Sequence, residues 1–197
     1  MRMLVLSAVL ATGLLAATAA PAQTTARLRG TITAVEGDML SVRSREGETL
    51  RLKLADNASV AVATAIRFED IKAGDYVGAT TRKAADGSMV AIEVHYLPPT
   101  AAQGQTAWDL EPETLMTNAS VAATVSATGS RELLLEFKGG SQKIVVPASA
   151  ALVRAVPGAR SDLKLGEYVF AVVQKAADGS LSVPRIQVSK DGVKPPQ

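Results

Sequence analysis

The residue types and spacing in this 197-residue sequence point to one place for chemistry, the stretch AIEVHYLPP. It contains Glu93 and His95, and His95 is the only histidine in the chain. Because side chains two residues apart in a β-strand point to the same face, the carboxylate and the imidazole would lie side by side. Such a pair can begin a metal site, but a tetrahedral site needs two more ligands. With no cysteine in the sequence, those ligands would have to be carboxylates from elsewhere in the chain.

The same stretch also has a purely structural interpretation. Val90, Ile92 and Val94 alternate with other residues, which is the pattern of a strand with one apolar face. Glu93 and His95 then share the polar face, and the polar face of such a strand usually lies at the surface. We therefore prefer a solvated strand end, and we keep a metal site using His95, Glu93 and distant carboxylates as the alternative.

No sequence pattern of a catalytic centre accompanies this pair. No serine lies in a G-x-S-x-G elbow, and no glycine-rich phosphate loop precedes a helical pattern. No spacing singles out two of the 19 acidic residues as an acid and base. We expect a protein that is not an enzyme and that uses no cofactor.

The first 22 residues have the organisation of a secretory signal peptide. A basic Arg2 is followed by an apolar or small-residue run from Leu4 to Ala17 and by the small-residue ending APA. We expect cleavage between Ala22 and Gln23 and a periplasmic or secreted protein. No later run approaches the roughly 20 apolar residues that cross a bilayer, so we expect no membrane span after cleavage.

The charge and the aromatic content argue against nucleic acid as a partner. Lys and Arg total 21 against 19 Asp and Glu, a formal net charge of +2. The chain has one Trp, three Tyr and three Phe, whereas faces that bind single strands combine basic grooves with stacking aromatics. The partner we expect is an unidentified protein or another component of the cell envelope.

The strings KAADGS at 83–88 and 175–180 show that the chain is a duplication. At a shift of 92 residues, DIKAGDYVGATTRKAADGSMVAIEV matches DLKLGEYVFAVVQKAADGSLSVPRI. Runs such as LRLKL alternate with period two, which indicates half-buried strands. The sequence therefore predicts an all-β protein made of two tandem homologous small β-barrels, OB-like or SH3-like.

The repeated string is itself predicted to be a hairpin loop, in which an aspartate binds the turn backbone and a glycine takes a positive φ. A second glycine in each copy is expected to end a one-turn segment before the next strand. The predicted turn residues are Asp86, Gly87, Asp178, Gly179, Gly74 and Gly166. Pairing of the two aspartates around a cation is the less favoured alternative, because the loop offers too few other oxygens.

The repeat also sets the expected domain boundaries. They are a signal peptide at 1–22, a first barrel at 23–97, an ordered linker at 98–117, a second barrel at 118–190 and a C-terminal tail at 191–197.

The linker carries the only tryptophan, Trp108, which we expect to pin it against one or both barrels. The strand that begins at Tyr168 is apolar on both faces and needs a cover. We predict that Tyr168, Phe170 and Val172 take part in packing with the Trp108 linker there; the alternative is that this surface anchors a partner.

The stretches RGTITAVEGDMLSVRSREGETLRLKLADNASV and DIKAGDYVGATTRKAADGSMVAIEVH resemble a family of uncharacterised exported alphaproteobacterial proteins. More distantly they are similar to the bacterial domain DUF5666. Members of the family are sometimes labelled metal ABC transporter permease, and a permease needs several membrane-spanning helices that this sequence lacks after residue 22. We expect an exported, non-enzymatic binding or scaffold protein, with a periplasmic metal-binding accessory factor as the alternative.

Overall fold

The computed structural model describes residues 24–127 and 130–196, and over those residues the chain is all-β, as the sequence predicts. The predicted signal peptide lies outside the described residues. The strands are β1 (Thr24–Glu36), β2 (Met39–Ser44), β3 (Thr49–Ala65), β4 (Tyr76–Lys83), β5 (Met89–Tyr96), β6 (Gly104–Trp108), β7 (Thr114–Ala127), β8 (Ser130–Phe137), β9 (Gly140–Val145), β10 (Ala151–Pro157), β11 (Tyr168–Lys175) and β12 (Leu181–Val188). Two single-turn 3₁₀ helices are η1 (Phe68–Asp70) and η2 (Arg160–Asp162).

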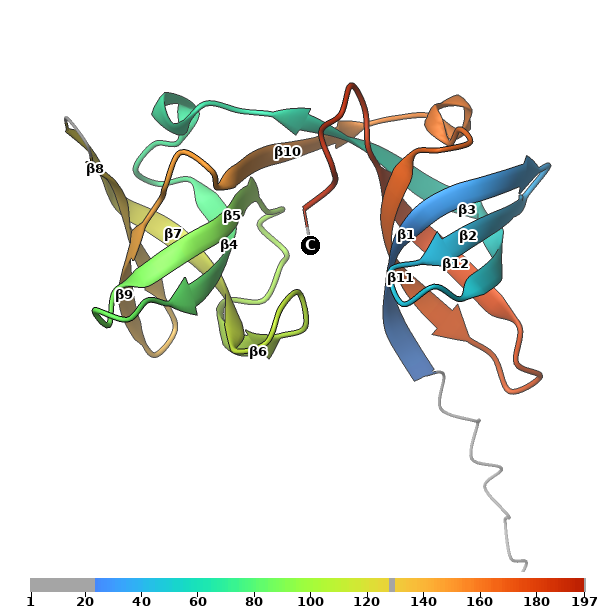
Figure 1. Ribbon diagram of the computed structural model, residues 1–197, viewed down its shortest axis with the longest axis horizontal. Helices are drawn as coiled ribbons and strands as arrows, with labels where there is room; N and C mark the ends of the chain where they lie inside the picture. Colours follow the sequence, from blue (N-terminus) through green and yellow to red (C-terminus); the bar gives the residue numbers. More distant parts are fainter. Residues whose placement is uncertain (1–23, 128–129, 197) are drawn as a thin grey trace, which may run out of the picture.

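Strands β1, β2, β3, β11 and β12 form a closed five-stranded barrel, which we call the first lobe (Figure 1, right). The strands are paired in the order β12-β11-β1-β2-β3, and a parallel pairing of β12 with β3 closes the ring. Alternate side chains fill the interior, among them Leu40, Val42, Leu52 and Leu54. The period-two run LRLKL thus supplies core residues, as its pattern indicates.

Strands β4, β5, β7, β8 and β9 form the second lobe (Figure 1, left). Their order is β5-β4-β7-β8-β9, and β5 also pairs with β9. The lobe has a hydrophobic core of its own, which includes Phe68, Val77, Leu133, Leu135 and Ile144. Strand β6, from the predicted linker, pairs with β7 outside this run.

The two lobes do not correspond to the two halves of the sequence. The second lobe is one continuous segment, 76–145, whereas the first lobe is built from 24–65 and 168–188. The predicted boundaries 23–97 and 118–190 are therefore wrong as boundaries of the lobes. The physical reason is β3, a 17-residue strand that does not turn back after closing the first lobe but continues toward the second. Strand β10 carries the chain back alongside it.

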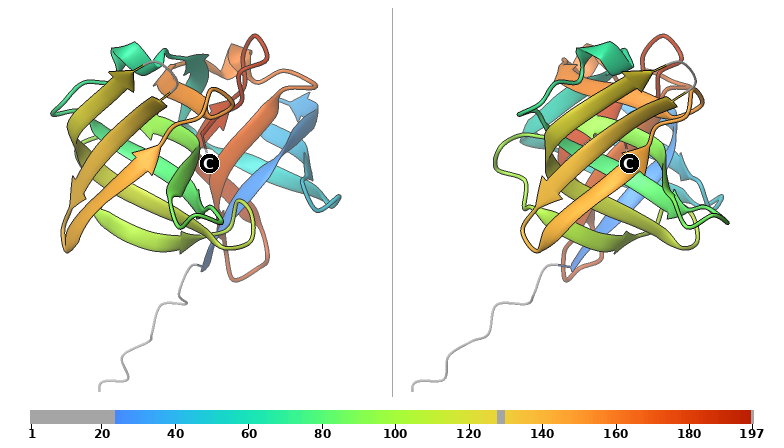
Figure 2. Two further views of the ribbon diagram at one scale, coloured as in Figure 1. Left: turned by 60° about the vertical axis from the view of Figure 1, so that its left-hand side comes forward. Right: turned by 90° about the vertical axis from the view of Figure 1, so that its left-hand side faces the viewer.

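This exchange of strands is symmetric about the β3–β10 pair. The two strands are antiparallel, and Ala63 pairs with Ala155, its equivalent 92 residues along the chain. The parallel pairing of β12 with β3 has the same register as that of β5 with β10, so that Arg185 and Glu93 occupy equivalent places. Figure 1 shows β10 between the two lobes at the top of the view, where it pairs with the end of β3, and Figure 2 shows the molecule from two further directions. Equivalent strands of the repeat therefore serve opposite lobes.

The two KAADGS loops form equivalent turns. The Ser88 amide donates to Asp86 Oδ1 and the Ser180 amide to Asp178 Oδ1, both at 2.9 Å. Hydrogen bonds from the Ser88 and Ser180 side chains, together with these amide bonds, hold the pKa of each aspartate below its usual range. The turn glycines all have a positive φ: Gly87 87°, Gly179 84°, Gly74 90° and Gly166 86°. A residue with a Cβ would be strained in this conformation.

Candidate functional site

Glu93 and His95 are buried, with exposed fractions of only 4% and 8%. Strand β5 lies between β4 and β10, and β10 pairs with β5 along the three residues from Glu93 to His95. The prediction of a solvated strand end is wrong, because both side chains are buried and this end of β5 pairs with β10, from the other half of the sequence. Strand alternation places the pair on one face, but it carries no information about elements that are distant in the sequence.

The two side chains lie close together in a setting that keeps the imidazole neutral. His95 Nδ1 is 3.6 Å from Glu93 Oε1, and the Thr80 hydroxyl donates to the same carboxylate oxygen at 3.0 Å. Burial lowers the pKa of His95 to about 4 because desolvation disfavours the imidazolium. At neutral pH the pair is therefore a neutral imidazole beside a buried carboxyl group.

A glycine makes room for the imidazole. Gly78 of β4 pairs with His95, and a Cβ at position 78 would lie 2.7 Å from His95 Nε2. The equivalent strand of the other half has Phe170 at this place and Gln187 in the place of His95. A glycine inside a strand is a sequence signal for close approach. It is the signal that could have revealed the crowded surroundings of His95.

The geometry supplies only part of a metal site. Glu93 and His95 come together as expected, but among residues 24–127 and 130–196 no three His, Asp or Glu side chains are placed to hold an ion. Asp86 and Asp178 lie in separate hairpin loops of separate lobes and bind their own turns.

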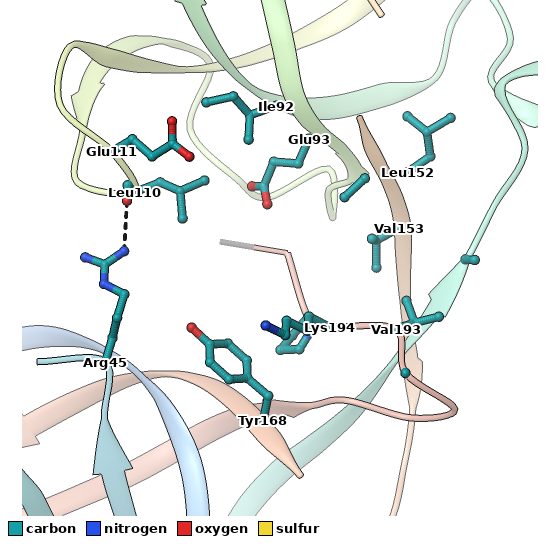
Figure 3. Close-up of a pocket in the computed structure, with 14 residues that line it drawn as sticks. Arg45, Ile92, Glu93, Leu110, Glu111, Leu152, Val153, Tyr168, Val193 and Lys194 are labelled. Carbon is teal, nitrogen blue, oxygen red and sulfur yellow. Dashed lines mark hydrogen bonds between the residues drawn. The ribbon is translucent and has the colours of Figure 1, made fainter. Parts of the chain in front are cut away.

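A cavity of about 510 Å³ lies between the two lobes (Figure 3). Much of its wall is apolar, including Ile92, Leu110, Leu152, Val153 and Val193. Figure 3 shows the carboxylates of Glu93 and Glu111 on one side, with Arg45, Tyr168 and Lys194 on the other. Arg45 donates to the Leu110 carbonyl at 2.8 Å, which links the turn after β2 to the segment after β6. The arrangement suits a ligand with an apolar body and a charged end.

A second cavity, of about 370 Å³, also takes its walls from both lobes. His95 lines it from β5, Phe170 and Val172 from β11, and Arg185 and Gln187 from β12. The Gln187 side-chain oxygen is buried and makes no hydrogen bond to any described residue. Glu93 and His95 thus line different cavities, although they are neighbours on one strand.

Trp108 belongs to a cluster of arginines that joins the linker to the first lobe. The Arg27 guanidinium lies 4.0 Å from the Trp108 ring centroid. The Arg29 guanidinium lies 6.0 Å from the Trp108 ring and 5.4 Å from the Phe170 ring. Asp109 accepts a hydrogen bond from Arg29 at 2.7 Å and lies 3.5 Å from Arg27, and these contacts, the Arg29 bond foremost, lower its pKa. Because β6 pairs with β7, the linker contacts both lobes.

The residues predicted to pack with Trp108 have different surroundings. Tyr168 lines the larger cavity, Phe170 lies near Arg29 and Val172 is 44% exposed. The predicted shared cover is thus wrong for Val172. Sequence reasoning missed Arg29, a buried cation on β1. Its signal is the alternation in TTARLRG, which places Arg27 and Arg29 on one face opposite the core residue between them.

Comparisons with known proteins give no relative for this arrangement. No protein-family model matches the chain, and neither a curated protein nor a solved structure matches it. Within the described part of the chain, no helix has the length and apolar composition needed to cross a membrane.

Proposed function

We propose that this chain is an exported, non-enzymatic binding protein whose ligand occupies the 510 Å³ cavity between the lobes. The observation that carries the proposal is the cavity itself, which combines apolar walls with the carboxylate of Glu93. A pocket of a few hundred Å³ with apolar walls and a few polar groups is the usual form of a small-molecule site. Both lobes and the segment after β6 contribute to the wall, so a bound ligand would also hold the lobes together.

The charges around the cavity favour a ligand with a cationic end. Glu93 is the most deeply buried acidic side chain of the wall. Arg45, on the opposite side, already donates to the carbonyls of Asp109 and Leu110. A cationic group would lie beside Glu93 and Glu111, while an aromatic or aliphatic body would contact the apolar wall. Both glutamates also have contacts within the protein, Glu93 with Thr80 and Glu111 with Arg82.

Thermal unfolding with amphipathic probes tests this function. Phenethylamine and longer aromatic amines should raise the melting temperature saturably, and by more than the corresponding carboxylates. Ala151→Trp should abolish the shift, because Ala151 is exposed and lines the cavity, so an indole there fills it without removing a core side chain. Ala85→Trp, in the exposed KAADGS loop, is the matched control. Equal shifts in the two variants would place binding elsewhere and reject the proposal.

The finer statement about the fold is part of the proposal. We interpret the two lobes as two copies of one small OB-like or SH3-like barrel that have exchanged strands, each half being similar to DUF5666 domains. The 92-residue repeat and the β5–β9 pairing support this interpretation.

The proposed periplasmic or secreted location requires removal of residues 1–22. Mass spectrometry of the exported protein should give Gln23 as its first residue.

The metal-binding alternative retains one supporting observation, the 3.6 Å approach of His95 to Glu93. Zinc, copper or nickel should then shift the melting temperature, and His95→Ala should remove the shift. A chain with no saturable response to these ions would leave the metal hypothesis without support.

A further inference from the structure

The last described residues of the chain re-enter the cleft between the lobes. Lys190 and Val193 form a two-residue turn, with N–H···O distances of 3.1 and 2.9 Å. Asp191 and Gly192 have φ values of 51° and 79°, which is the pattern of a type I′ turn. Before it, the Ser189 amide donates to the Tyr168 carbonyl at 2.8 Å, which ties the end of β12 to β11. The turn therefore directs residues 193–196 between the lobes (Figure 1).

This tail fills the cleft only in part. Pro195 and Pro196 are both buried, one lining the larger cavity and the other the smaller. The Lys194 ammonium lies 4.9 Å from the centroid of the Tyr168 ring. Open volumes of about 510 and 370 Å³ remain beside the tail. The cleft is thus larger than the segment that lies in it.

The cleft has the chemistry of a groove for an extended, proline-containing segment. Proline has no backbone N–H, so it can be buried without leaving a donor unsatisfied. Prolines also restrict the free segment to extended conformations, which lowers the entropy lost on binding, and grooves that recognise them are lined by aromatic rings. Here Tyr168 lines the larger cavity, while Tyr96 and Phe170 line the smaller one. The basic residue next to the prolines, Lys194, lies over the face of the Tyr168 ring, so an aromatic face favours a cation at this position.

We propose that the cleft binds an extended peptide segment in which a basic residue precedes proline, and that residues 193–196 occupy it as an internal substitute for that ligand. This inference rests on the proposed binding function and specifies its ligand class. A segment of a partner protein with this chemistry displaces the tail, which swings out about the turn at residues 190–193.

Release of the tail in the full chain tests the proposal. Pro195→Asp combined with Pro196→Asp places carboxylates at buried positions and disfavours the docked tail. The probe is a labelled synthetic peptide with the sequence of residues 189–196, followed by fluorescence anisotropy. The released variant should bind it about ten-fold or more tighter than the wild-type chain, whose attached tail competes at an effective concentration on the order of millimolar.

Two altered peptides and a second variant make the test specific. Glutamate in place of the lysine that corresponds to Lys194, or alanine in place of both prolines, should weaken binding about ten-fold, as the loss of a principal anchor does. Pro195→Gly with Pro196→Gly releases the tail without adding charge, in case the aspartate variant does not fold. Folded released variants that bind no peptide, or that bind all three peptides equally, would overturn the inference. If the amine probes still bind in the Ala151-dependent manner, only the ligand class fails; if neither probe binds, the proposed function fails with it.

Discussion

Acidification from pH 7 to pH 4.5 should destabilise this fold through His95. The pKa of its imidazole is about 4 in the folded chain against an ordinary value of 6.5, because burial disfavours the charged form. Between these two values the unfolded chain binds a proton that the folded chain does not, so stability falls as the pH falls. At pH 7 the stability is fully present; by pH 4.5 the loss amounts to about 2 to 3 kcal/mol, since each pKa unit is worth about 1.4 kcal/mol.

Urea unfolding between pH 7 and pH 4.5 measures this loss. His95→Gln is the matched control, because glutamine is neutral throughout and stands at the equivalent place in the other half as Gln187. Asp70, whose pKa is lowered to about 2, loses its stabilising charge only at lower pH and does not confuse the comparison. Because the chain has a single histidine, its Hε1 resonance reports the folded-state pKa without assignment. An imidazole that titrates near 6.5 in the folded protein, or an equal pH dependence in the glutamine variant, would refute the reasoning.

Three further perturbations test the packing. Trp108→Ala should lower the free energy of unfolding by about 1 to 2 kcal/mol, because it removes the packing of a half-buried ring and the cation–π contact with Arg27 at 4.0 Å. An unchanged urea midpoint would mean that the ring does not hold the linker. Gly78→Ala should cost about 1 to 3 kcal/mol through the clash with His95, and much less when His95→Ala is also present, as a double-mutant cycle would show. Proteolytic cleavage in the exposed linker between Pro98 and Gln103 should leave the two fragments associated, and they should elute at the native size in gel filtration, because each lobe contains strands from both halves of the sequence or pairs with them. Fragments that separate without denaturant would contradict the strand pairing.

Local chemistry explains which parts of the fold the sequence could predict. Strands such as those containing Leu52 and Leu54, and the turns at Gly87 and Gly179, depend on alternation and on left-handed glycine, both of which are visible in short windows of sequence. The exchange of strands is not visible there. If each half of the sequence closed its own barrel, its last strand would pair with its own long strand, in the same register that β12 and β3 now have. The two arrangements differ only in the direction that the chain takes after Ala65.

The candidate site could be predicted in part for the same reason. Alternation along β5 correctly places Glu93 and His95 on one face, but their burial depends on elements that lie far away in the sequence. The cavity could not be predicted, because its walls come from both lobes, from the segment after β6 and from the tail. Gly78, a glycine inside a strand, is the one local feature of the sequence that indicates close packing around His95.

The nesting of one lobe inside the other has a consequence for the order of folding. During synthesis, which starts at the N-terminus, every strand of the second lobe is available once residue 145 has been added. The first lobe cannot close before β11 and β12, residues 168–188, have been added. Strand β1, among the first residues to emerge, then pairs with one of the last strands, which gives the first lobe a high contact order and slow closure. Until then β1, β2 and β3 lack the two strands, β11 and β12, that close the barrel. The arrival of residues 168–188 therefore decides when the first lobe can close, whereas the second lobe has all its strands by residue 145.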